Sequence, residues 1–234
     1  MVRQALPSLR LYGVRPIFVQ GFGCGGVFSK GDSMTHSVDL SDYECTLCEL
    51  FSQESARTHE AIEFGQNMTA PRKPGEIARD IMIGKRAEAA VAKVLVREYG
   101  LHIPVNYDVY PEKDGDDADF TINGWAIDVK SSRNGRWAMY PVAKLENRRR
   151  QGKLPDVILF CNTPWNREAD RPEGRTIRIM GFTGINKLTK TRLNRGDYIP
   201  GTRMPLQTDN YAVDMNDLCD FDDSVTYMLK KKRG

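Results

Sequence analysis

Residues 117–132 read DADFTINGWAIDVKSS and carry the clearest structural signal in the chain. Two runs rich in strand-forming residues flank Asn123-Gly124. Asn-Gly between such runs is the strongest short-range signal for a β-hairpin, because a type I′ turn needs positive φ at both positions. A two-residue turn fixes the register, which is predicted to place Asp119 opposite Asp128.

The two faces of this hairpin differ in chemistry, because side chains alternate between the faces of a strand. One face is predicted to be polar and to carry Asp119, Thr121, Ala126, Asp128 and Lys130. The other is predicted to be apolar and to carry Phe120, Ile122, Trp125, Ile127 and Val129.

Two directly opposed carboxylates repel one another. A divalent cation between Asp119 and Asp128 would offset that repulsion, and Mg²⁺ prefers one or two carboxylates together with water and phosphate oxygens. Lys130, on the same face, would also help to neutralise the pair. The alternative is a solvated hairpin with an acidic cluster, since Asp114, Asp116 and Asp117 are close in the sequence.

A long helix is predicted from about Glu76 to Tyr99, with Gly100 at the C-cap position. Its apolar stripe is predicted to hold Ile77, Ile81, Gly84, Val91, Ala92, Leu95 and Tyr99. Glu88 falls near the centre of this stripe, where a carboxylate is costly unless it is paired or bound to a metal. The alternative for Glu88 is a salt bridge with a lysine or arginine at the edge of the core.

The remaining pattern predicts an α/β or α+β protein with a central mixed sheet flanked by helices. Strands are expected at Val105–Tyr110, Asp117–Ile122, Trp125–Ser131, Asp156–Cys161 and Thr176–Phe182, and a short basic helix at Pro141–Gln151. The 234 residues suffice for one domain with an appendage. We expect an irregular N-terminal arm or subdomain at 1–74, a core at 75–185, and a C-terminal extension at 186–234 that packs on the core.

The core resembles the PD-(D/E)xK nuclease superfamily, which includes many restriction endonucleases and Holliday-junction resolvases. Members carry Gly-x-x-x-Glu on a helix, matched by Gly84 and Glu88, then an Asp at the start of one strand, matched by Asp119. The next strand carries (D/E)-x-K, matched by Asp128-Val129-Lys130. The resemblance covers roughly residues 75–185 and implies a restriction-endonuclease-like core.

The resemblance implies a Mg²⁺-dependent endonuclease that hydrolyses DNA phosphodiester bonds, with Mn²⁺ able to substitute. Asp119 and Asp128 would bind the metal directly, with the Val129 carbonyl as a further ligand. Glu88 would bind through water or complete a second metal site. Lys130 would orient or activate the attacking water and stabilise the charge of the transition state.

Two positions depart from the family pattern. Ala118 stands where the family name places a proline, and Asp128 where glutamate is commoner, so neither change removes a ligand. The motif names neither the recognition site nor the choice between DNA and RNA. A catalytically idle nucleic-acid-binding protein of the same fold is the main alternative, and a zinc-stapled interaction module is a third. Symmetric cutting of both DNA strands would favour a two-fold homodimer.

Basic side chains next to the predicted site are candidates for contacts with a phosphate backbone. The candidates are Arg133 after the second strand of the hairpin and Lys144, Arg148 and Arg149 on the short helix. The alternative is a solvated basic helix face. The net charge of +3 does not decide between these interpretations, because local patches and not totals attract nucleic acid.

The N-terminal segment contains Cys45-x-x-Cys48, which is compatible with half of a structural zinc site. His59, His36 or Cys24 would complete the tetrahedron. No second Cys-x-x-Cys and no paired histidines accompany it, so the alternative is that these are ordinary free cysteines.

No apolar run approaches the roughly 18 residues that a membrane-spanning helix needs. Arg10, Arg15 and Pro16 interrupt any signal-peptide core near the N-terminus. We therefore expect no membrane association and a cytoplasmic location.

Overall fold

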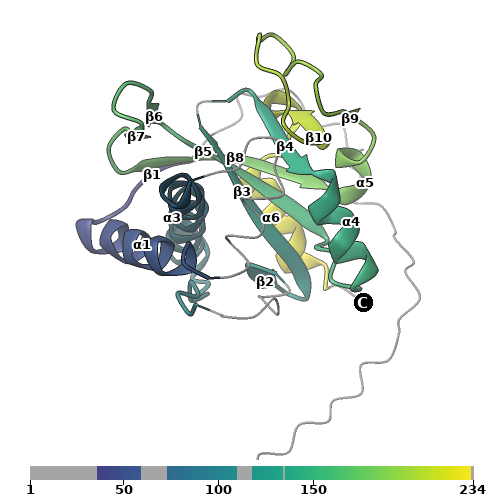
Figure 1. Ribbon diagram of the computed structural model, residues 1–234. Helices are drawn as coiled ribbons and strands as arrows, with labels where there is room; N and C mark the ends of the chain where they lie inside the picture. The colour runs from purple at the N-terminus through teal and green to yellow at the C-terminus, as the bar shows by residue number, and fades with distance from the viewer. Residues whose placement is uncertain (1–35, 59–72, 110–117, 134, 233–234) are drawn as a thin grey trace, which may run out of the picture.

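A computed structural model describes residues 36–58, 73–109, 118–133 and 135–232 (Figure 1). Its helices are α1 (Asp42–Ser55), α3 (Pro74–Tyr99), α4 (Val142–Arg150), α5 (Ile185–Leu188) and α6 (Phe221–Lys230), with a 3₁₀ turn at Met215–Asp217. Its strands are β1 (His36–Asp39), β2 (Phe120–Ile122), β3 (Trp125–Arg133), β4 (Trp137–Pro141), β5 (Val157–Thr163), β6 (Trp165–Asn166), β7 (Arg171–Pro172), β8 (Thr176–Gly184), β9 (Arg192–Leu193) and β10 (Asn210–Asp214).

The central sheet has five strands in the order β1-β8-β5-β3-β2. Only β3 and β5 run parallel, and every other neighbouring pair in this sheet is antiparallel. A parallel pair needs a crossover, which here contains β4 and α4. Two smaller sheets, β4-β10-β9 and β6-β7, accompany it. The expectation of an α+β protein with a mixed sheet is thus confirmed.

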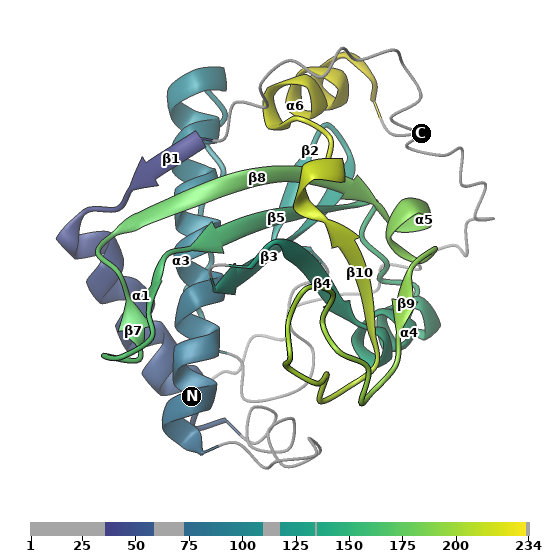
Figure 2. The ribbon, with the colours of Figure 1, turned by 90° about the horizontal axis from the view of Figure 1, so that it is seen from above.

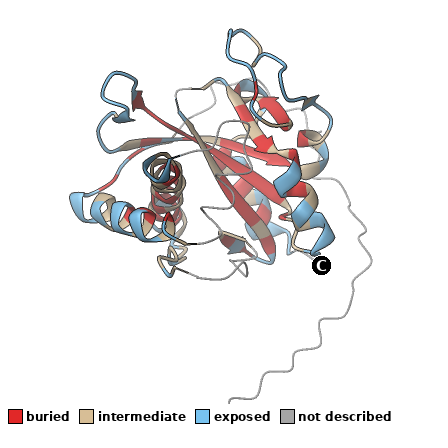
Figure 3. Ribbon diagram, in the orientation of Figure 1, coloured by how far each residue is buried: buried red, intermediate tan, exposed pale blue. Residues whose placement is uncertain are grey.

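Apolar layers cover both faces of the central sheet. Ile127 and Val129 of β3 pack into a cluster with α1, α3 and α6, whereas Ile158 and Phe160 of β5 pack into a second cluster with β4, β10, α4 and α5. Figure 2 shows α1 and α3 on one side of the sheet and β4, β10 and α4 on the other. Covering on both faces explains why every residue of β5 is buried (Figure 3).

The Asn-Gly hairpin forms as predicted. Asn123 and Gly124 have φ of 48° and 86°, and β2 pairs with β3 in the predicted register, Phe120 with Ile127. The ladder is shorter than predicted, however. The Asp119 N–H donates to the carbonyl of Ile127, which already pairs with Phe120, so regular pairing ends there and Asp119 does not continue the ladder opposite Asp128.

The strand predicted at 105–110 is wrong for its described residues, 105–109, which are not in a strand. The alternation that suggested it is real, because Ile103, Val105 and Tyr107 all pack against the core. The segment lies against helices instead of a strand: Lys85 of α3 donates to the Asn106 carbonyl over 2.9 Å. An alternating pattern marks a half-buried extended chain and does not by itself supply a pairing partner.

The expectation of an irregular segment at 1–74 is wrong for residues 36–58. They form β1, an edge strand on β8, and α1, which begins with a capping box between Ser41 and Glu44. Leu40, between the two elements, is 1% exposed in the main core. The other end of the chain also contributes, because β10 pairs with β4, and Phe221 of α6 is buried in the core.

Candidate active site

The polar face of β3 points toward β4 and α4. The Asp128 side chain is only 1% exposed and makes two ion pairs, one with Lys130 and one with Arg148 of α4, whose guanidinium donates to Oδ1 over 2.6 Å. Burial alone would raise the pKa of Asp128, but the charges of Lys130, Lys144 and Arg148 lower it below its usual value. Asp128 is therefore a fixed, buried negative charge.

Asp119 precedes β2, and its side chain reaches β3, the strand that carries Asp128, Val129 and Lys130. Its Oδ2 accepts a hydrogen bond from the Val129 N–H over 2.6 Å, which holds the carboxylate beside the Asp128-Val129-Lys130 segment. Burial raises the pKa of Asp119, and the negative charge of Asp128 raises it further, against the opposing effect of Lys130. The two aspartates are thus electrostatically close, although they are not paired residues of the ladder.

Glu88 lies on the buried side of α3, as the helical pattern predicts, with its side chain 14% exposed. It has the lysine partner required by the salt-bridge alternative, because Lys85, one turn earlier, donates to its carboxylate over 2.5 Å. Burial and then the charge of Asp119 raise the pKa of Glu88 to about 7. Glu88 is therefore both a salt-bridge partner and a close electrostatic neighbour of Asp119.

Lys130 is held among acceptors. Its Nζ donates to the Val129 carbonyl over 2.9 Å and lies 5.3 Å from the centre of the Tyr140 ring. Burial alone would lower the pKa of Lys130, but the charges of Asp128 and Asp119 raise it to about 12. Lys130 is therefore a permanent cation near neutral pH and donates hydrogen bonds instead of accepting a proton.

Helix α4 brings two more cations to this face. Arg148 contacts Asp128 directly, and Lys144 lies four residues earlier on the same side of the helix. The positive charge of Lys130 is the largest of the effects that lower the pKa of Lys144 to about 8. The structure thus gathers Glu88, Asp119, Asp128, Lys130, Lys144 and Arg148 from three parts of the chain.

The other two predicted nucleic-acid contacts are engaged elsewhere. Arg133 forms an ion pair with Asp80 and lies 4.3 Å from the centre of the Trp165 ring. Arg149 bonds to Glu146 on the exposed side of α4 over 2.8 Å. Among the described residues, their ion-pair partners are thus Asp80 and Glu146 and not the aspartates of the site.

Two neighbours of the site, Lys85 and Tyr140, are not among the predicted site residues. Lys85 was detectable, since three-residue spacing on a helix places it beside Glu88. Tyr140 is completely buried, and its ring packs beside Lys130. Its contribution depends on β4 pairing with β10, about 70 residues away in the chain, a pairing that no local pattern announces.

The oxygen donors of Asp119, Asp128 and Val129 have the chemistry that Mg²⁺ prefers. The fit is incomplete in this conformation, because Lys130 and Arg148 occupy the Asp128 carboxylate and Lys130 also bonds to the Val129 carbonyl. Within the ranges that the structure describes, no three or more His, Cys, Asp or Glu side chains form a group that could hold a metal ion. Metal binding at this site thus requires the two cations to release these oxygens.

The zinc site stays a prediction, because Cys24 and His59 lie outside the described residues. Cys45 and Cys48 are free thiols on α1, and Cys48 is buried with its Sγ 3.8 Å from the Tyr107 hydroxyl. His36 bonds to Asp222 instead, over 2.9 Å.

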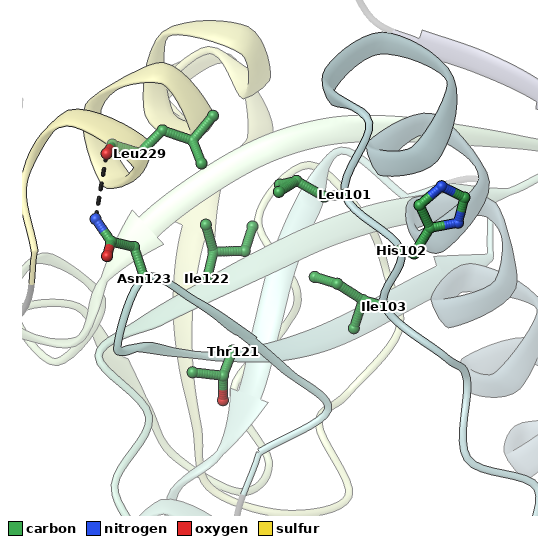
Figure 4. Close-up of a pocket in the computed structure, with 7 residues that line it drawn as sticks. All are labelled: Leu101, His102, Ile103, Thr121, Ile122, Asn123 and Leu229. Atoms are coloured by element: carbon green, nitrogen blue, oxygen red, sulfur yellow. Dashed lines mark hydrogen bonds between the residues drawn. The ribbon is translucent and has the colours of Figure 1, made fainter.

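A hollow of about 400 Å³ lies apart from the carboxylates (Figure 4). It is lined by Leu101, His102, Ile103, Thr121, Ile122, Asn123 and Leu229. The Asn123 amide donates to the Leu229 carbonyl over 3.2 Å and so ties the hairpin turn to the end of α6. With no carboxylate among its lining residues, this hollow does not offer the chemistry of the charged cluster.

Among the residues that the structure describes, no helix has the length and apolar composition to cross a membrane. Comparisons of the chain with protein-family models, with curated proteins and with solved structures found no match.

Proposed function

We propose that the protein is a Mg²⁺-dependent endonuclease that hydrolyses DNA phosphodiester bonds, with a restriction-endonuclease-like core. One observation carries the proposal: the carboxylates of Glu88 and Asp119 and the Asp128–Lys130 ion pair meet from α3, the residue before β2, and β3. The parallel pairing of β3 with β5, after a helical crossover, supports the same arrangement. Mn²⁺ would be able to substitute for Mg²⁺.

Asp119, Asp128 and the Val129 carbonyl would hold the metal, and Glu88 would complete its surroundings through water. When bound, Mg²⁺ would supply a Lewis acid that polarises the phosphate and acidifies a water molecule. The buried lysine has its own part. Because Lys130 stays protonated, its ammonium would orient the attacking water and stabilise the negative charge that grows on the phosphate oxygens.

The experiment is a cleavage assay on plasmid, linear, single-stranded and branched DNA and on RNA, with Mg²⁺, Mn²⁺ or EDTA. Wild type is compared with Asp119→Ala and Lys130→Ala, and with Arg150→Gln as an exposed charge-loss control on α4. We expect metal-dependent cutting that both site variants lose and the control keeps. Equal cutting in EDTA, or in Asp119→Ala, would contradict the proposal.

A second candidate is a catalytically idle nucleic-acid-binding protein of the same fold. It is favoured by the double ion pairing of Asp128, which neutralises the principal metal ligand with side chains. This candidate predicts nucleic-acid binding that is the same in Mg²⁺ and in EDTA, without cutting of any substrate. The same set of substrates, tested for binding and for cleavage with and without metal, therefore distinguishes an endonuclease from a binding protein.

If both strands of a symmetric site are cut, we propose a two-fold homodimer, since each active site serves one strand. Sedimentation of the protein alone and with DNA tests this. The cytoplasmic location expected from the sequence stays a prediction.

A further inference from the structure

We propose that Lys144 is a second lysine of the active site and binds the same substrate phosphate as Lys130. The inference rests on the proposed function, because it assigns the reacting phosphodiester to the space between these two side chains. It concerns this chain's own helix α4, which lies outside the Asp-Asp-x-Lys motif.

Helix α4 presents Lys144 and Arg148 on the face that it turns toward the active site. Arg148 and Lys144 are four residues apart and therefore share one face of the helix. Since the Arg148 guanidinium reaches the Asp128 carboxylate over 2.6 Å, that face of α4 is turned toward β3. In agreement with this placement, the positive charge of the Lys130 ammonium is the largest of the effects that lower the pKa of Lys144 to about 8.

The three cations of the site differ in whether they are ion-paired. Lys130 and Arg148 are both ion-paired with Asp128. Lys144, by contrast, has no hydrogen bond or ion pair with any other residue in the described part of the chain, and it is exposed to solvent. The carboxylates of Asp128 and Asp119 offset part of the repulsion between the ammonium groups of Lys144 and Lys130, but the pKa of Lys144 stays lowered. A phosphate oxygen placed between the two ammonium groups would favour both cations.

The other basic candidates do not meet these conditions. Arg133 is bound to Asp80, and Arg149 is bound to Glu146. Of the four basic residues singled out near the site, Lys144 alone combines an unpaired cation with closeness to Lys130 among the described residues. The ligand class is thus a phosphate group, bound by two lysines from β3 and α4.

The test measures phosphate binding separately from cleavage. Thermal unfolding is followed in EDTA with increasing inorganic phosphate, at constant ionic strength with chloride, for wild type, Lys144→Gln, Lys144→Arg and Arg150→Gln. Arg150→Gln removes one positive charge from the same helix at an exposed position. We expect phosphate to raise the Tm of wild type, Lys144→Arg and Arg150→Gln, and to leave that of Lys144→Gln nearly unchanged.

Cleavage kinetics provide the second readout. If Lys144 contacts the reacting phosphate, kcat of Lys144→Gln falls on the order of 10-fold to 100-fold, with partial rescue by Lys144→Arg and no change in Arg150→Gln. A phosphate-induced Tm shift that is the same in wild type and Lys144→Gln, or absent in wild type, overturns the proposal whether or not the protein cuts DNA. Absence of cleavage with a Lys144-dependent shift overturns the proposed function alone and supports the phosphate site.

Discussion

Glu88 is a carboxylate on the buried side of α3, with two neighbours that act on its protonation in opposite directions. Its side chain is 14% exposed and accepts a hydrogen bond from Lys85 over 2.5 Å, which favours the ionised form. Burial and the charge of Asp119 favour the protonated form more strongly, so the pKa of Glu88 is raised to about 7.

The raised pKa of Glu88 predicts a pH-dependent stability. The folded-state pKa is about 7 against an ordinary 4.5, so the contribution of Glu88 to stability is complete below pH 4.5 and is lost as pH rises through 7. Urea unfolding in EDTA, from pH 5 to pH 8, should therefore show wild type losing on the order of 3 kcal/mol relative to Glu88→Gln. Parallel pH profiles for the two proteins would show that the pKa of Glu88 is not raised by folding.

The position of Glu88 on the apolar side of the helix was predictable from periodicity alone, and the structure buries it there. Its neighbours were harder to predict. Lys85 could be found by helical spacing, but the closeness of Asp119 depends on how the hairpin packs against α3, which a helical pattern does not contain.

Arg148 predicts a competition for Asp128. Since its guanidinium and a metal ion require the same carboxylate, Arg148→Gln should raise the affinity for Mn²⁺ severalfold in calorimetric titration. Arg150→Gln, an exposed change of the same charge, should leave the affinity unchanged. A weaker affinity in Arg148→Gln would instead make Arg148 a residue that positions Asp128 for the metal.

At the scale of elements, local signals were reliable where the partner was near in sequence. The Asn-Gly turn predicted both strands of the hairpin and their register, and Gly100 correctly marked the end of α3 in the left-handed conformation. They failed for residues 105–109, because alternation shows which side chains are buried but not whether a neighbouring strand is available.

The hairpin turn provides a prediction about backbone conformation. Gly124 has φ of 86°, where an L side chain is strained, so Gly124→Ala should lower the free energy of unfolding by about 1–2 kcal/mol. Gly75 lies in the first turn of α3 with open space around it, and Gly75→Ala should be neutral or slightly stabilising. Equal effects of the two substitutions in urea unfolding would contradict this account of the turn.

At the scale of the whole molecule, the missed elements are those whose partners are distant in sequence. β1 pairs with β8, so that His36 lies opposite Ile179, and β4 pairs with β10. The mixed character of the sheet was predictable from the order of elements. The two edge pairings were not, because long-range pairing is decided by the shape of the assembled core and not by the segments themselves.

The inclusion of residues 36–58 in the core predicts a large effect of one N-terminal side chain. Leu40 is 1% exposed, and Leu40→Ala should cost about 2–5 kcal/mol of stability by leaving a cavity. Leu50 on α1 is 59% exposed, so Leu50→Ala should change stability by less than about 0.5 kcal/mol. Matching small losses for both would mean that this segment does not belong to the core.

The decisive measurement is the cleavage of DNA by Asp128→Asn, because this substitution keeps the size of the side chain and removes the buried negative charge that pairs with Lys130 and Arg148. With Mg²⁺ and the substrate that wild type cuts best, we expect Asp128→Asn to retain its fold and to lose cleavage activity on the order of 100-fold or more. Cleavage by Asp128→Asn at the wild-type rate would show that the Asp128 carboxylate takes no part in the reaction and that the proposed site is wrong.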